Sequence, residues 1–551
     1  MPNRNVESHF SQLPRADIHR STFDRSHSIK TSFNVGDVIP FYVDEVLPGD
    51  SFDIKTSKVI RMPSLITPIM DNLYLDTYYF YVPNRLVWDH WRELCGENRE
   101  SAWVPTVTYE VPQVTSPTGG WAIGTIADYM GIPVGVSNLS VNAMPFRAYS
   151  LICNEWFRDE NLTDPLLTPT NDTTVQGVNT GNYITDCAKG GLPFKAAKYH
   201  DYFTSCLPAP QKGPDVSIPV AEQGPLPVYT GKDVPFPNPL GENDVLKFLQ
   251  PGGSQPGSYR NVGIGPNGLV GMTSTASSIG LSDALTPANL WVAPVPAAAA
   301  TINQLRMAFQ IQKMYERDAR GGTRYIEILK SHFGVTSPDA RLQRPEYLGG
   351  NRIPININQV LQQSETTDTS PQGTPTGQSL TSDTHSDVHK SFVEHGFVIG
   401  LMVCRYDHTY QQGLERFWSR RERFDYYWPV FANIGEQAVL NKEIYAQGTA
   451  VDDEVFGYQE AWADYRYRPN RVTGEMRSAS SQSLDVWHLA DDYDTLPRLS
   501  DQWIREDGKT VDRVIAVTSA ITHQLFADIY IQCRSTRPMP VYSVPGLIDH
   551  H

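Results

Sequence analysis

The chain has 551 residues, a formal net charge of -15 at pH 7, 19% charged residues and 11% aromatic residues. Such an acidic chain lacks the overall basic footprint of a dedicated nucleic-acid-binding protein, although it leaves room for a local basic patch. Charged residues are scarcer than the roughly 25% of ordinary globular proteins. The 27 tyrosines and 11 tryptophans suit either extensive protein interfaces or one large β core.

The cysteines and the N-terminus bear on the compartment in which the chain is made. The six cysteines are scattered and form no C-x-x-C pair, so we expect neither a zinc ribbon nor a thioredoxin motif. Their wide spacing is typical of reduced, buried thiols in a protein made in a cytoplasm. The first 20 residues contain no apolar signal segment, and no run of about eighteen apolar residues predicts a membrane span.

Extended strands dominate both ends of the chain. Residues 33–43 alternate apolar and polar, a Pro48-Gly49 turn follows, and residues 73–82 are apolar on both faces, as in a strand buried between two layers. Strands are predicted again at 393–403 and 521–533. Strands at both ends with helices and loops between them predict a mainly β, sheet-on-sheet body that carries insertions.

Helices, arms and loops fill the rest of the chain. Apolar spacing of 3, 4 and 7 predicts helices over residues 146–161 and 301–333, the second broken at Gly321-Gly322. Residues 207–297 hold fifteen of the 41 prolines, which predicts a surface insertion without central strands. The remaining predicted segments are an N-terminal arm (1–30), an exposed Ser/Thr/Gly-rich loop (363–390) and a C-terminal tail (534–551).

The short motifs in this chain do not predict a site for catalysis or cofactor binding. The G-x-G-x-x-G at 263–268 has neither the preceding strand nor the following helix that a dinucleotide site requires. His385, His389 and His395 lie close together, but surface histidines are a better interpretation than a metal site without a helix. No G-x-S-x-G, H-E-x-x-H or Walker loop is present. We therefore expect no catalytic residue, metal or cofactor, although carboxylate pairs for glycoside hydrolysis stay open.

Two clusters mix arginine with aromatic residues, at 416–428 and 465–471. Arginine for phosphate and aromatic faces for bases is the chemistry of single-strand binding. The same residue types dominate protein–protein interfaces, and the acidic chain favours that interpretation or a core role. The candidate DNA contacts are Arg420, Arg421, Arg466 and Arg468.

Several long blocks resemble the major capsid proteins of the Microviridae, the small single-stranded DNA phages, in the gokushovirus branch. The blocks are residues 26–91, 142–162 (NAMPFRAYSLICNEWFRDENL), 300–335, 341–350 (RLQRPEYLGG), 426–439 (YYWPVFANIGEQAV), 457–478 and 538–551. They occur in family order and cover most of the chain outside 207–297 and 363–390. Such blocks are far more specific than any short motif.

The resemblance implies an eight-stranded viral jelly roll with large loop and helical insertions. It implies that copies of the chain form a T = 1 icosahedral shell around circular single-stranded DNA. It further implies an insertion that protrudes at the threefold axes and meets a bacterial surface receptor. The segment at 207–297 would match it, with Phe236, Phe248 and Leu249 as apolar residues for a threefold cluster to bury.

The resemblance also implies partners and a location. The expected partners are a small basic DNA-packaging protein, which the acidic charge also favours, and a minor capsid or pilot protein. The location is the virion, after assembly in the host bacterial cytoplasm. The first interpretation is thus a non-enzymatic capsid subunit. The alternative is a secreted or surface carbohydrate-binding or carbohydrate-hydrolysing β-sandwich, a class that usually has a signal segment and often has disulfides.

Overall fold

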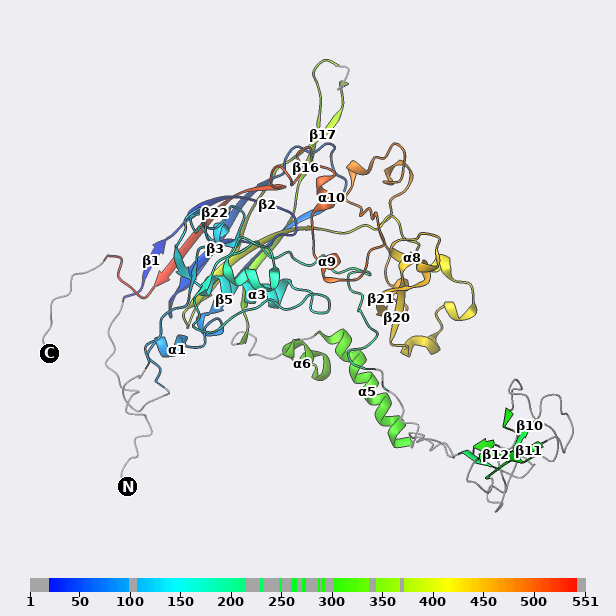
Figure 1. The fold of residues 1–551 in the computed structure, drawn as a ribbon. Helices are drawn as coiled ribbons and strands as arrows, with labels where there is room; N and C mark the ends of the chain where they lie inside the picture. The colour runs from blue at the N-terminus through cyan, green and yellow to red at the C-terminus, as the bar shows by residue number, and fades with distance from the viewer. Residues whose placement is uncertain are drawn as a thin grey trace, which may run out of the picture. The chain divides into compact units, whose positions relative to one another are not determined.

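The computed structural model divides the chain into two compact units, which are Met1–Lys212 with Glu316–His551, and Gly213–Tyr315 (Figure 1). The structure describes residues 19–98, 107–214, 216, 228–230, 247–249, 259–264, 270–273, 286–287, 290–292, 302–322, 324–335, 343–366 and 371–542.

The first antiparallel sheet of the larger unit contains the first two strands and the last strand of the described chain. Its order is β2-β22-β4-β18, and β1 pairs with the far end of β22. The strands are β1 (Ser21–Asp24), β2 (His27–Phe33), β4 (Ser51–Arg61), β18 (Thr381–Ser391) and β22 (Leu525–Arg537). Side chains of β4 and β22 alternate between buried and solvent-facing, as expected for a sheet with one wet face.

The second antiparallel sheet has the order β3-β19-β5-β15. Its strands are β3 (Ile39–Val46), β5 (Leu73–Pro83), β15 (Glu346–Pro354) and β19 (Gly396–Tyr406). In chain order, the eight long strands pass back and forth between the two sheets, which is the connectivity of a jelly roll. Phe33, Ile54, Leu75, Met402 and Ile529 belong to the core that contains residues of both sheets.

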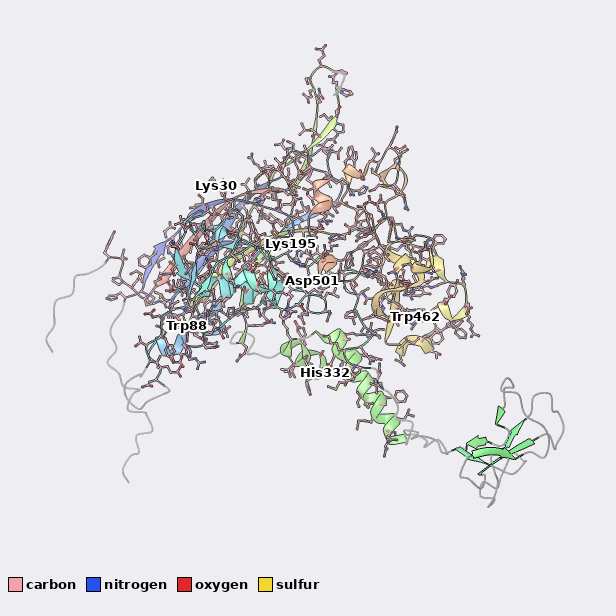
Figure 2. The ribbon with its side chains drawn as sticks, viewed as in Figure 1. Lys30, Trp88, Lys195, His332, Trp462 and Asp501 are labelled. Atoms are coloured by element: carbon pink, nitrogen blue, oxygen red, sulfur yellow. The ribbon has the colours of Figure 1, made fainter. Side chains whose placement is uncertain are left out.

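A second core covers the outer face of this sheet, and so explains why β5 and β19 are buried on both faces. Phe80, Ile399 and Leu401 pack there with Trp88 (labelled in Figure 2) and Trp121. The covering elements are α1 (Trp91–Leu94), β6 (Gln113–Thr115), α2 (Ile126–Tyr129), β7 (Ser140–Asn142), α3 (Met144–Ile152), a π turn (Cys153–Phe157), β8 (Val175–Gln176) and α4 (Tyr183–Asp186).

The predicted helix over 146–161 is shorter than expected, because the backbone turns extended at Arg158. The predicted helices over 301–333 are confirmed as α5 (Ile302–Gly321) and α6 (Tyr325–Phe333). None of the helices in the described part of the chain has the length and apolar character needed to cross a bilayer.

A long insertion joins β19 to β22. It contains β20 (Glu436–Leu440), α8 (Asn441–Ile444), β21 (Val455–Glu460), α9 (Asp501–Ile504) and α10 (Lys509–Asp512), joined by several 3₁₀ turns. A small third core, which includes Tyr202, Phe203, Tyr410, Val439 and Phe456, supports it.

The smaller unit differs from the expectation of a Pro-rich segment without central strands. Short strands fit between the prolines, and β10 and β11 each have a neighbour on both sides. The strands are β9 (Val228–Thr230), β10 (Lys247–Leu249), β11 (Tyr259–Ile264), β12 (Val270–Thr273), β13 (Thr286–Pro287) and β14 (Leu290–Val292). The one proline within them, Pro287, lies in the edge strand β13, where a missing N–H costs least.

Three predicted segment boundaries need correction. The proposed arm over 1–30 contains β1 and most of β2, and the proposed tail over 534–551 begins inside β22. The proposed loop over 363–390 contains β17 (Pro375–Ser379), which pairs with β16 (Ile357–Leu361), and nearly all of β18. Polar sequence hid these strands, because they lie at sheet edges or in a hairpin that projects from the body (Figure 1).

Candidate nucleic-acid interface

A cleft of about 630 Å³ lies in the insertion between β19 and β22. Two segments far apart in sequence, 410–420 and 464–477, form most of its walls. Six arginines line it against three carboxylates, on a chain of net charge -15. The charged lining residues are Arg416, Arg420, Arg466, Arg468, Arg471 and Arg477, with Glu415, Glu443 and Asp464. The cleft is therefore a local basic site on an acidic protein.

The most exposed arginines of the cleft are held mainly by surface ion pairs, together with a hydrogen bond from Arg466 to the carbonyl of Ala461 and contact of Arg468 with the Phe417 ring. Glu415 pairs with both Arg468, at 3.4 Å, and Arg471. Arg466 pairs with Glu460. The side chains of Arg466 and Arg468 are 61% and 69% exposed. Exposed pairs of this kind contribute about 0–1 kcal/mol, so an incoming phosphate can compete for these guanidinium groups.

The four arginines predicted as DNA contacts thus differ in their position and in how exposed their side chains are. Arg466 and Arg468 lie together in the cleft and are exposed. Arg420 lines the cleft but is only 9% exposed, because it pairs with Asp464 and lies 4.2 Å from the ring centroid of Tyr465. Arg421 lies outside the lining, and its backbone N–H donates to Asp425 at 2.8 Å. Arg420 is therefore well placed to hold the wall in shape.

Exposed aromatic rings line part of the cleft and continue beyond it along the chain. Trp418 is 67% exposed, and its ring centroid lies 4.6 Å from that of Phe417. Residues 421–430, here called the aromatic ridge, are all exposed. Their four aromatic side chains are Phe424, Tyr426, Tyr427 and Trp428. Exposed aromatic surface of this extent marks an interaction site.

Trp462, labelled in Figure 2, anchors the aromatic ridge to the rest of the insertion. Its backbone is left-handed, with φ of 64°, a conformation that costs a bulky residue about 1–3 kcal/mol. Its ring stacks on Phe431 at 6.2 Å, and its Nε1 donates to the Phe431 carbonyl at 3.2 Å. Tyr427 packs edge-on against the same indole. The strained residue thus fixes the segment that presents the exposed rings.

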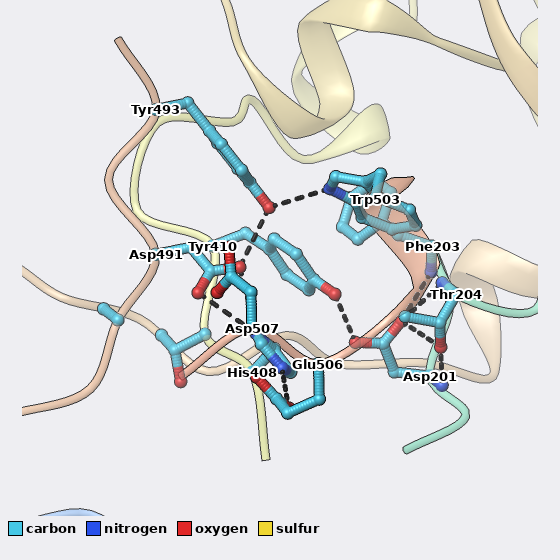
Figure 3. A network of polar contacts seen from close by, with 12 residues as sticks. Asp201, Phe203, Thr204, His408, Tyr410, Asp491, Tyr493, Trp503, Glu506 and Asp507 are labelled. Atoms are coloured by element: carbon cyan, nitrogen blue, oxygen red, sulfur yellow. Dashed lines mark hydrogen bonds and ion pairs between the residues drawn. The ribbon is translucent and has the colours of Figure 1, made fainter. Parts of the chain in front are cut away.

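A buried polar network (Figure 3) adjoins the cleft at Tyr410 and Phe203, which also line the cleft. His408 lies between Asp491, at 3.0 Å, and Glu506, at 2.9 Å. Burial lowers the pKa of His408, but the two carboxylates outweigh burial and raise that pKa to about 10. Burial raises the pKa of Asp491, yet His408 holds it well below its usual range. Tyr493 donates to Asp491 at 2.9 Å. The network is therefore an imidazolium held by two carboxylates.

A further buried carboxylate, that of Glu443, lines the cleft itself. Glu443 accepts a hydrogen bond from Tyr202 at 3.0 Å and pairs with Arg416 at 3.5 Å. Burial raises the pKa of Glu443 despite Arg416. Tyr202 in turn stacks on Tyr467 with ring centroids 5.2 Å apart. These contacts make the inner wall of the cleft rigid.

Sequence reasoning did not select Arg471 and Arg477 as DNA contacts, and it gave Glu415 no role. Arg471 belonged to the Arg/aromatic cluster, and Arg477 lies in the 457–478 block. Neither observation shows that these residues face the segment 410–420. Of the predicted threefold residues, Phe236 lies outside the described residues, and Phe248 and Leu249 lie in β10. In the described ranges, no group of three metal-ligating side chains could hold an ion.

Eight strands in two sheets place the chain in the jelly-roll class, which includes viral capsid proteins and lectins. A family model described as "Capsid protein (F protein)" matches residues 11–547. The chain belongs to this family of phage capsid proteins, and it is accordingly a structural protein of the virion that assembles into a multimeric shell.

Three relatives agree with this assignment. The capsid protein VP1 of Chlamydia phage 1 is 41% identical, with 98% of each chain covered. That of Bdellovibrio phage phiMH2K is 42% identical, with 99% of this chain and 98% of the relative covered. That of Spiroplasma virus 4 is 43% identical, with 99% of each covered. The prediction of a capsid subunit is confirmed, and the carbohydrate-active alternative receives no support.

Proposed function

We propose that the chain is the repeating subunit of a T = 1 icosahedral shell that encloses a circular single-stranded DNA genome. The observation that carries this proposal is the match to phage capsid proteins over nearly the full length of both chains. The jelly roll supports it, because its two sheets form a rigid body from which long insertions can reach neighbouring subunits. In this role the chain is not an enzyme and needs no cofactor.

The cleft is the proposed contact with the genome. Arg466, Arg468 and Arg471 would bind phosphates, and Trp418 would stack on an unpaired base. The excess of arginine over carboxylate in the cleft supports this role, since the rest of the chain is acidic. Such contact is phosphate-led, so it weakens with salt and has no sequence preference.

The acidic charge also supports the proposed partners. A small basic DNA-packaging protein would neutralise the phosphates that this chain leaves unpaired. A minor capsid or pilot protein is the second partner. All described cysteines are free thiols, which agrees with assembly in the reducing cytoplasm of the host bacterium.

The insertion at 207–297 is the proposed contact with a bacterial surface receptor. In a threefold cluster, it would bury Phe236, Phe248 and Leu249 against two further copies. Replacement of 225–285 by a short Gly/Ser linker tests this role. We expect intact shells that no longer adsorb to the host, and unchanged adsorption would contradict the assignment.

The genome contact is tested by replacing Arg466, Arg468 and Arg471 with glutamine together. Arg61→Gln and Arg92→Gln serve as matched controls, because both side chains lie outside the cleft. DNA content per particle and particle stability are measured at several salt concentrations. We expect the triple variant to lose DNA or stability in a salt-dependent manner. If it behaves like the controls, the cleft does not contact the genome.

A further inference from the structure

The two chain segments that lead into and out of the smaller unit meet at one group of charged side chains on the larger unit. Lys212 ends the incoming segment, and Asp318 lies in the last turns of α5 on the outgoing segment. We call this group the stalk cluster. It comprises Glu155, Arg158, Asp159, Glu160, Lys212, Asp318, Arg324, Glu327 and His332.

Arg324 is the centre of the stalk cluster. Its Nε lies 3.2 Å from Oε2 of Glu155, and its Nη1 pairs with Glu160 and lies 3.1 Å from Oε1 of Glu327. Its Nη2 donates to the carbonyl of Asn154 at 2.5 Å. Arg324 immediately precedes α6, and its backbone N–H donates to Oε2 of Glu327 at 3.2 Å. One guanidinium thus docks the start of α6 on the segment 154–160.

A second contact ties the other end of α6 to α5. The Nε2 atom of His332 (labelled in Figure 2) is 2.6 Å from Oδ1 of Asp318. Between the helices, Gly322 has φ of 86°, and a Cβ there would lie 2.4 Å from Oε2 of Glu327. The turn therefore requires glycine, and it brings α6 back against α5. Together these contacts hold α6 at both ends.

Lys212 adds a third element to the cluster. Its ammonium nitrogen is buried without a hydrogen-bond partner in the described residues. Burial lowers the pKa of Lys212, while Glu160, Asp318, Glu327 and Asp159 oppose that shift. The ammonium group of the incoming segment is therefore buried near carboxylates that also contact Arg324 and His332. Any change in their ionisation acts on both segments at once.

The charges in the cluster do not balance when every carboxylate is ionised. Five carboxylates then face Arg158, Lys212 and Arg324, with His332 as a fourth cation only when protonated. Burial and a hydrogen bond with Glu160 raise the pKa of Glu327. One proton held between these two carboxyl groups removes half of the imbalance, and a protonated His332 would remove the rest. Without that proton, two ionised carboxylates face each other beside Arg324.

We propose that the stalk cluster is a proton-operated clamp within the larger unit, at the points where the chain leaves this unit and re-enters it. With a proton between Glu160 and Glu327, the cluster holds α6 on the segment 154–160, and loss of the proton loosens α6 and the attachment of Lys212. An acid that binds its proton more tightly in the folded state stabilises that state at low pH. The clamp is therefore closed at low pH and loosens as the pH rises.

Hydrogen exchange of the full-length chain tests the clamp, read by mass spectrometry between about pH 5 and pH 8 and corrected for intrinsic exchange. We expect protection of the α6 amides to fall by up to about ten-fold per pH unit, while β19 stays protected throughout. Glu327→Gln imitates the protonated acid, so we expect its α6 protection to stay high and flat with pH. Glu365→Gln, at an exposed position, is the matched control and keeps the wild-type profile.

A second variant keeps the test independent of Glu327. Arg324→Gln removes the central cation, so we expect α6 to lose protection at every pH while β19 remains protected. Two results would overturn the proposal. One is wild-type protection of α6 that does not change with pH. The other is a Glu327→Gln profile with the same pH dependence as the wild type.

Discussion

Nε2 of His408 lies 2.9 Å from Oε2 of Glu506, and this buried contact joins the start of the long insertion to its far end. The backbone N–H of Glu506 donates to the carbonyl of Ala196. The preceding residue, Lys195, forms a β-bridge with Asp37 in the connection between β2 and β3. The contact therefore fastens the wall of the arginine cleft to the jelly roll. Its strength sets how rigidly the cleft is presented.

His408→Gln should destabilise the chain by about 3–5 kcal/mol, because it leaves two buried carboxylates without their cation. The pKa of His408 is raised to about 10. Its contribution is therefore complete below about pH 6.5 and is lost as the pH rises toward 10. Denaturant unfolding of the full-length chain across this range should show a decline that His408→Gln lacks. The exposed His389→Gln control should keep the wild-type slope; equal slopes in all three would contradict this role.

The N-terminal strands give a prediction about assembly. β1, which begins at Ser21, and β2, which ends at Phe33, both pair with β22. The Phe33 side chain is fully buried. Deletion of residues 1–20 spares both strands, so we expect a folded subunit that assembles poorly. Deletion of residues 1–33 removes both β1 and β2 together with the buried Phe33 ring, so we expect it to prevent folding. Circular dichroism and sedimentation separate the two effects, and normal particles from the shorter deletion would refute the prediction.

Arg420 and Arg468 should behave differently although both line the cleft. Arg420→Gln leaves Asp464 without its ion pair in a largely buried site, so we expect a loss of about 1–3 kcal/mol of stability. Arg468→Gln breaks an exposed pair, so stability should hardly change. Its binding of single-stranded DNA should become less salt-dependent, by about one phosphate contact. If both variants changed only stability, Arg468 would have no role in binding.

Much of the jelly roll follows from the sequence, and its polar strands do not. β5, β19 and β22 were predicted because apolar residues fill one or both faces of each strand. β18 was missed because its sequence, TSDTHSDVHKS, is polar, with Val388 as its one large buried apolar side chain. Its position depends on pairing with β4, a contact between strands more than 300 residues apart. Such pairing leaves little local signal.

The cleft was likewise only half predictable. The mixture of arginine and aromatic residues marked both of its walls. However, the different roles of Arg420 and Arg468 depend on their ion pairs with Asp464 and Glu415, and on how deeply each guanidinium is buried. Burial and ion pairing across the cleft arise only when the two segments fold together.

Trp418 gives the sharpest test of base stacking. Trp418→Ala should weaken binding of a single-stranded oligothymidylate by about 1–3 kcal/mol, the usual effect of one stacked base. Trp418→Phe keeps a ring and should recover most of that affinity. Fluorescence titration of the full-length chain measures both. Equal affinity of the alanine variant and the wild type would exclude stacking at this residue.

Electron microscopy of particles formed by the full-length chain with the genome tests whether this chain encloses DNA in the proposed way. We expect closed T = 1 icosahedral shells whose subunit is the two-sheet jelly roll. We also expect nucleic-acid density against Arg466, Arg468 and Arg471. Subunits that remain monomeric, or shells in which this cleft faces away from the DNA, would contradict the proposal.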